Sequence, residues 1–169
     1  MRKFLTLVLP VCLLLSACWD YKDLNKLSVV TGMAFDTEAD GRLRVTLEIV
    51  DRSASPEKEG LRTRSVEASG RDVEEAVGKA ERGLEYKLYY GAMAVAVFGQ
   101  DAPADKLQKW LLDNREARET VYVIHADEAW KKLQTEEDGG IASYKLRDIL
   151  DASKEEKPLE LYRAGGAGR

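Results

Sequence analysis

The chain has 169 residues, a formal net charge of −4 and 33% charged residues. This length fits one domain with its own core. The negative balance argues against a nucleic-acid-binding protein, which needs clustered cations against phosphates, and against electrostatic adsorption to anionic lipids.

The first twenty residues are typical of a secretory leader. Arg2 and Lys3 precede an apolar run of about twelve residues, shorter than the roughly 20 that cross a bilayer. The run ends in Leu-Ser-Ala-Cys at residues 15–18, which matches the lipobox of bacterial lipoproteins. We predict cleavage between Ala17 and Cys18, and a covalent diacylglycerol on Cys18 that an N-acyl chain can supplement. Two acyl chains hold a protein at a membrane, whereas one binds marginally.

Two other interpretations of this leader stay open, an uncleaved anchor and an ordinary signal cleaved nearby that leaves a free thiol. Under the lipidation hypothesis the mature chain begins at Cys18, and Cys12 is discarded with residues 1–17. No cysteine then remains for a disulfide or a zinc site, so packing alone must hold the exported domain together. We expect residues 18–27 to form a short lead between lipid and domain.

Residues 28–36 and 43–49 predict a β-hairpin around an Asp-Gly turn at residues 40–41. In the second strand apolar residues alternate with Arg44, Thr46 and Glu48, which predicts one face in contact with water. Residues 52–60 are expected to form an exposed loop. Residues 63–68 predict a weaker strand at a sheet edge, because its charged residues would oppose unwanted pairing.

Asp72 and Glu75 have the spacing of a capping box at the start of a helix, which Gly83 ends. Residues 88–98 are almost wholly apolar and predict a single strand in the middle of the sheet, covered on both faces.

Pro103 is expected to open a second helix, with Trp110 on its apolar stripe and the charged residues 113–118 as its exit. Another strand is predicted at residues 120–124, followed by a short helix capped by Asp127. An acidic loop at residues 135–140 and a last helix at residues 143–150 complete the domain, which we place at residues 28–152. Residues 153–169 should form a frayed tail.

The predicted fold is therefore α+β, with a mixed sheet of about five strands that begins with a hairpin and has three to four helices packed on it. No catalytic residue, metal site or cofactor is predicted. His125 is a lone histidine at the end of a predicted strand, where structural or solvent-facing roles are commoner than acid–base catalysis. Neighbouring acidic residues on a helix point in different directions, so the acidic pairs do not suggest a catalytic dyad.

Several segments occur in a fixed order along the chain: the lipobox followed by Cys-Trp-Asp, the strand at residues 25–36, the strand at residues 45–50, Ala-Ser-Gly at residues 68–70, Tyr-Gly-Ala at residues 90–92, and Asp-Asn-Arg-Glu-Ala-Arg at residues 113–118. Together these segments resemble the Ger(x)C family, the C-subunit lipoproteins of spore germinant receptors. The resemblance covers most of residues 15–125 and concerns the N-terminal portion of the family. We expect the family's further domains to be absent here. Ala92 stands where the family often has histidine.

This resemblance implies a non-catalytic subunit, lipid-anchored on the outer face of the spore inner membrane beside membrane-embedded receptor subunits, that helps the receptor answer nutrient germinants. Asp113, Arg115 and Arg118 are candidates for ion pairs with such a partner, although a solvated helix exit would have the same pattern. The alternative functions are a small-solute-binding or adaptor lipoprotein of the cell envelope and, with less support, an envelope hydrolase.

Overall fold

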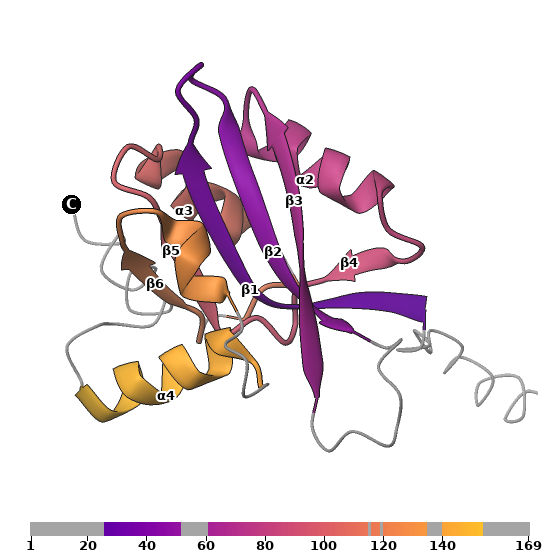
Figure 1. Ribbon diagram of the computed structural model, residues 1–169, viewed down its shortest axis with the longest axis vertical. Helices are drawn as coiled ribbons and strands as arrows, with labels where there is room; N and C mark the ends of the chain where they lie inside the picture. The colour runs from indigo at the N-terminus through magenta and orange to yellow at the C-terminus, as the bar shows by residue number, and fades with distance from the viewer. Residues whose placement is uncertain (1–25, 52–60, 115, 119, 135–139, 154–169) are drawn as a thin grey trace, which may run out of the picture.

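The computed structural model describes residues 26–51, 61–114, 116–118, 120–134 and 140–153. The elements in chain order are β1 (Leu27–Thr37), β2 (Leu43–Asp51), β3 (Arg62–Gly70), α2 (Val73–Arg82), β4 (Lys87–Tyr89), β5 (Val95–Phe98), α3 (Ala104–Asp113), β6 (Tyr122–His125), the 3-10 helix η2 (Ala129–Leu133) and α4 (Ala142–Ser153) (Figure 1). Among these elements no helix is both long and apolar enough to cross a membrane.

The strands form a mixed sheet in the order β3-β2-β1-β5-β6, with β4 also paired to β1. The β1–β2 and β2–β3 pairs are antiparallel, and β5 is parallel to both β1 and β6. The sheet begins with the predicted hairpin, and β3 lies at one edge as predicted. The α+β fold class is confirmed.

The single central strand predicted at residues 88–98 is wrong. The structure has two short strands there, β4 and β5, which pair in parallel with successive parts of β1. Between them a turn is closed by a hydrogen bond from the amide of Met93 to the carbonyl of Tyr90, and the amide of Ala94 then donates to Thr31. Gly91 permits this break, because a side chain there would collide with the ring of Tyr89. The central strand of the sheet is β1.

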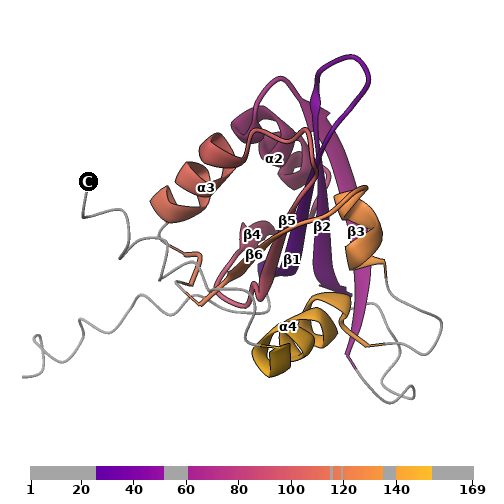
Figure 2. The ribbon, with the colours of Figure 1, turned by 90° about the vertical axis from the view of Figure 1, so that its left-hand side faces the viewer.

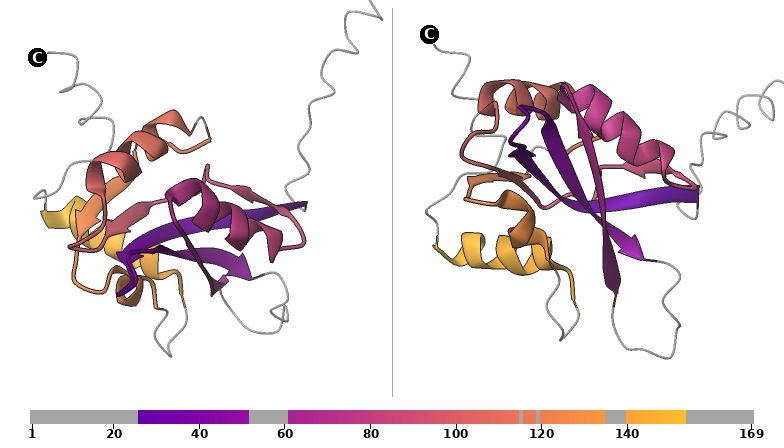
Figure 3. Two further views of the ribbon diagram at one scale, coloured as in Figure 1. Left: turned by 90° about the horizontal axis from the view of Figure 1, so that it is seen from above. Right: turned by 45° about the horizontal axis from the view of Figure 1, so that its top comes forward.

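Helices cover the sheet on both sides, with α2 and α3 on one face and η2 and α4 on the other (Figures 2 and 3). The α2/α3 face holds the larger core, in which Phe35 packs edge-to-face against Phe98 and Trp110. The opposite core is smaller and is built around Val95, Val97 and Leu133. Burial on both faces explains why β1 and β5 are apolar without alternation.

The water-exposed face predicted for β2 is wrong as well. Thr46 and Glu48 are only 2% and 1% exposed, because η2 and α4 cover this side of the hairpin. The Glu48 carboxylate accepts hydrogen bonds from the backbone amides of Ala142 (2.7 Å) and Ser143 (3.2 Å) at the start of α4. The hydroxyls of Thr31 (2.8 Å) and Thr63 (3.2 Å) also donate to it. A buried strand carboxylate thus caps a helix that begins more than ninety residues later.

Asp36 does the same for η2. Its carboxylate accepts from the amides of Ala129 (2.7 Å) and Trp130 (3.0 Å), and the residue is 8% exposed. The prediction that Asp127 caps this helix is therefore wrong. The residue before the helix, Glu128, has φ 48° and makes no side-chain capping bond.

At α2 the predicted N-cap and C-cap are borne out: the Asp72 side chain accepts from the Glu75 amide at 2.8 Å, and Gly83 is the C-cap. The return bond of the predicted capping box differs, because the Glu75 side chain accepts from the amide of Arg71 at 3.0 Å and not from that of Asp72. Pro103 immediately precedes α3 as its N-cap. The predicted leader, the loop at residues 52–60, most of the acidic loop and the tail from residue 154 lie outside the described residues.

The approach of α4 to β1 depends on Gly32. A Cβ atom at this position would lie 2.8 Å from the Cβ of Ser143 and 2.9 Å from Cδ2 of Leu133, closer than packed atoms approach. We predict that Gly32→Ala lowers the free energy of unfolding by about 1–3 kcal/mol, the usual cost of overpacking. Urea unfolding of the purified domain measures this.

Gly78 within α2 provides the matched control, because a Cβ there would meet only the side chain of Arg82 at 3.5 Å. Gly78→Ala should raise the unfolding free energy by about 0.5–1 kcal/mol through helix propensity. Equal effects of the two substitutions would show that α4 does not press on β1 at Gly32.

Candidate functional site

A cleft of about 390 Å³ opens between the start of α2, the length of α3 and the β1–β2 turn. We call it the α2/α3 cleft. Its apolar lining comes from Leu43, Val73, Leu107 and Trp110, the first three of which are buried. The volume lies within the range of small-molecule sites, which combine apolar walls with a few polar groups.

Trp110 is fixed in this wall by two aromatic neighbours. Its ring meets Phe35 at 6.4 Å and Tyr90 at 5.8 Å between centroids, both edge-to-face. Burial raises the pKa of Tyr90, and the nearby charges of Glu81 and Glu116 raise it further, so its hydroxyl stays protonated. The prediction that Trp110 packs against the core is confirmed.

Charges of both signs line the opposite sides of the cleft. Lys106 and Lys109 belong to α3, whereas Asp72 and Glu74 belong to the α2 side. Lys109 pairs along its own helix with Asp113 at 2.7 Å, and this pairing raises the pKa of the lysine. The walls are charged, yet no ion pair joins α2 to α3 among the described residues.

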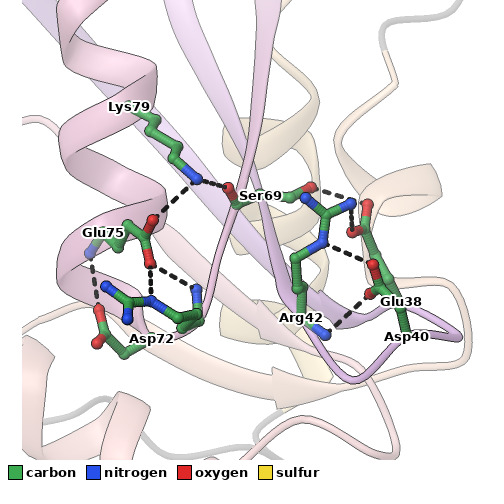
Figure 4. Close-up of polar contacts among 8 residues, drawn as sticks. Glu38, Asp40, Arg42, Ser69, Asp72, Glu75 and Lys79 are labelled. Atoms are coloured by element: carbon green, nitrogen blue, oxygen red, sulfur yellow. Dashed lines mark hydrogen bonds and ion pairs between the residues drawn. The ribbon is translucent and has the colours of Figure 1, made fainter.

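The α2 side of the cleft is held by an ionic network that Figure 4 shows. Arg71 lies 2.8 Å from one oxygen of Glu75, and Lys79 lies 3.0 Å from the other. The side-chain hydrogen bond from Arg71, supported by its backbone amide and by Lys79, lowers the pKa of Glu75 to about 2. The same contact raises the pKa of Arg71. Glu75 therefore stays ionised well below neutral pH.

The β1–β2 turn joins the same network through Ser69, the next-to-last residue of β3. The Ser69 hydroxyl donates to Glu38 at 2.8 Å, and its carbonyl accepts from Lys79 at 2.9 Å (Figure 4). Arg42 pairs with Glu38 and Asp40, and its backbone amide is the main cause of the lowered pKa of Asp40. Exposed ion pairs of this kind contribute little stability singly. Together they fix the orientation of the turn against α2.

The residues predicted as partner contacts are placed only in part. Asp113 is exposed at the end of α3 and lines the α2/α3 cleft, and Arg118 is exposed in the turn that follows. Arg115, Ala17 and Cys18 lie outside the described residues. The structure therefore brings one of the three predicted contact residues to the cleft.

His125 is exposed at the end of β6, with its ring edge-to-face against Phe98 at 5.7 Å. Within the ranges that the structure describes, no group of three or more His, Cys, Asp or Glu side chains is placed to hold a metal ion. The buried carboxylates of Asp36 and Glu48 are engaged by backbone amides, so their geometry is that of helix caps.

Sequence reasoning missed the cleft and both buried carboxylates. The cleft is formed by residues from three separate parts of the chain, which no local spacing connects. For Glu48 the local signal was misleading, since its alternation with apolar residues is the ordinary pattern of a half-exposed strand.

A family model described as "Spore germination protein N-terminal domain" matches residues 20–161. The match contains all of the described strands and helices. Comparison with curated proteins and with solved structures gives no match.

The Glu75 ion pairs predict a pH dependence. Because the folded pKa is lowered to about 2 from an ordinary value of 4.5, the contribution of Glu75 to stability is present above pH 4.5 and is lost as the pH falls towards 2. The difference in unfolding free energy between wild type and Glu75→Gln should therefore stay constant above about pH 5 and shrink below it. Denaturant unfolding at a series of pH values measures it.

Glu74→Gln removes a negative charge from the same helical turn without disturbing the pairs with Arg71 and Lys79, and serves as the matched control. A Glu75→Gln effect that is unchanged at pH 2 would contradict the assignment.

Proposed function

Because the chain belongs to the spore germination protein N-terminal domain family, we propose that it is a membrane-tethered, non-catalytic lipoprotein subunit of a spore germinant receptor. The resemblance drawn from the sequence is confirmed at the level of the family. The single observation that supports the finer proposal is the lipobox at residues 15–18, directly upstream of the matched domain.

The proposed mechanism is positional. Diacylglycerol on Cys18, with or without an N-acyl chain, anchors the protein to the outer face of the spore inner membrane. The first described strand begins at Leu27. A fully extended chain spans at most about 3.5 Å per residue, so the domain starts within about 30 Å of the lipid. Such confinement raises the effective concentration of the domain against membrane-embedded receptor subunits.

The tether is needed because the rest of the chain gives little reason to adsorb to a membrane. The formal charge is −4 for the whole chain, and removal of Arg2 and Lys3 with the leader makes it two units more negative. An acidic protein is repelled by the anionic lipids that attract basic segments. Membrane residence should therefore depend on the acyl chains.

Contacts with the receptor subunits are expected to be polar at the exit of α3. Asp113 at the cleft, together with Arg115 and Arg118, supplies charges of both signs over a short segment. Ion pairs at the rim of an interface favour correct partners and faster association more than they add affinity. This fits a subunit that the membrane already holds near its partners.

Substitution of Cys18 tests the proposal. Cys18→Ala removes the sulfur that carries the lipid, so the protein should leave the membrane fraction of spores. The rate of nutrient-triggered germination should fall by about 100-fold or more, the order of enhancement gained by confinement. Germination by a stimulus that bypasses nutrient receptors should be unchanged.

Cys12→Ala is the matched control, since this cysteine lies within the leader and should be dispensable. Normal membrane residence and nutrient response in Cys18→Ala spores would refute the tethered-subunit proposal. Equal loss in the Cys12→Ala control would show that the leader, and not the lipid, carries the effect.

A further inference from the structure

The β3 strand forms an open edge of the sheet. It pairs with β2 along all nine residues in one unbroken antiparallel register, from Leu43 opposite Gly70 to Asp51 opposite Arg62. No other described strand pairs with it on its outer side. Figure 1 shows the N-terminal half of β3 extending beyond the end of α2. A long edge strand with an unbroken register and no proline is a template for an added strand.

Two observations fix which backbone groups point to this edge. In the β1–β2 turn the Glu38 amide donates to the carbonyl of Arg42, so the backbone polar groups of Arg42 face β1. Along a strand these groups alternate between the two neighbouring strands, so Leu47 and Ile49, which lie an odd number of residues after Arg42, direct their amides towards β3. Val66 and Arg64, which lie opposite them in β3, therefore form backbone hydrogen bonds with β2. The alternate residues of β3 direct their backbone N–H and C=O groups outward. Lys79 reaches the carbonyl of Ser69 from α2 at 2.9 Å, in agreement with this alternation.

The Lys79 contact occupies the C-terminal end of the edge. Ser65 and Glu67 have the same orientation as Ser69 and are exposed. Their N–H and C=O groups therefore face the side of β3 on which no described strand lies. Their backbone donors and acceptors are available for the hydrogen bonds that an added strand would form.

The side chains along the edge specify the charge of a partner. Arg62 and Arg64 are exposed and share the face on which Val66 packs towards α2. Within the described ranges neither arginine makes an ion pair. Glu67 projects from the opposite face, because successive residues of a strand alternate.

We propose that the outer edge of β3 binds an extended acidic segment of a partner protein by strand addition. In the antiparallel orientation the segment places an apolar residue beside Val66 and carboxylates beside Arg64 and Arg62, with neutral residues on the Glu67 face. Opposite charges directly across a strand pair are stabilising, and like charges are not. The identification of the partner as a receptor subunit rests on the proposed function. The preference of the β3 edge for an extended acidic segment is independent of that function.

A second copy of the chain fits this edge less well. Directly opposed residues of an antiparallel pair lie on the same face, so Arg64 could meet Arg64 or Val66 of the other copy but never its Glu67. With Arg64 opposite Arg64, like charges face each other. With Arg64 opposite Val66, neither arginine has a carboxylate opposite it. The charges therefore favour an acidic partner over self-association.

Amide hydrogen exchange of the purified full chain, followed by NMR, tests the proposal. The probes are two synthetic peptides, Thr-Val-Thr-Glu-Thr-Glu-Thr and the same sequence with lysine in place of glutamate. The acidic peptide should protect the amides of Ser65 and Glu67, whereas those of Arg64 and Val66 are protected already by β2. It should bind at least about ten-fold more tightly than the lysine peptide.

The double variant Arg62→Glu and Arg64→Glu should reverse this preference, and Arg82→Glu, which changes another exposed arginine, on α2, should leave it unchanged. Absence of protection at Ser65 and Glu67, equal binding of the two peptides, or protection that rises with protein concentration without peptide would each overturn the proposal. None of these results would bear on the Cys18 experiment, so the two proposals fail separately.

Discussion

Two carboxylates buried in the β1–β2 hairpin hold the C-terminal part of the domain in place. Asp36 and Glu48 each accept two backbone amides, from η2 and α4 respectively. A buried carboxylate is costly unless hydrogen bonds satisfy it, and the first amides of a helix have no partner within the helix. The helix start thus supplies the hydrogen-bond donors that the carboxylate needs, and the carboxylate supplies the acceptor that the first amides need. Charge-assisted hydrogen bonds of this kind contribute about 1.5–3 kcal/mol.

The two caps allow a single sheet to carry helices on both faces. The α2/α3 face is fixed by a large apolar core, whereas the opposite face has a smaller core and depends on the two caps. Gly32 allows α4 to approach closely enough for Glu48 to reach its amides. Among the surfaces that these helices leave open are the α2/α3 cleft and the outer edge of β3.

The sequence predicts the local features well and the long-range ones poorly. The hairpin, the α2 cap at Asp72 and the edge position of β3 depend on neighbouring residues, so pattern and turn chemistry reveal them. Glu48 was expected to face water because its partners at Ala142 and Ser143 lie over ninety residues away. The cap of η2 was assigned to the nearby Asp127 for the same reason. The apolar run at residues 88–98 looked continuous, since a turn at Gly91 leaves its hydrophobicity unchanged.

Amide hydrogen exchange in Glu48→Gln measures most directly whether the hairpin carboxylate holds α4. Glutamine keeps the size of the side chain and removes its charge. It also places an N–H group opposite groups that donate hydrogen bonds to Glu48, so these donors lose an acceptor. The amides of Lys145 and Leu146 should exchange at least about ten-fold faster, the effect of losing about 1.4 kcal/mol of local stability, while that of Leu47 in β2 changes far less. Unchanged protection in α4, or an equal loss at Leu47, would contradict this role.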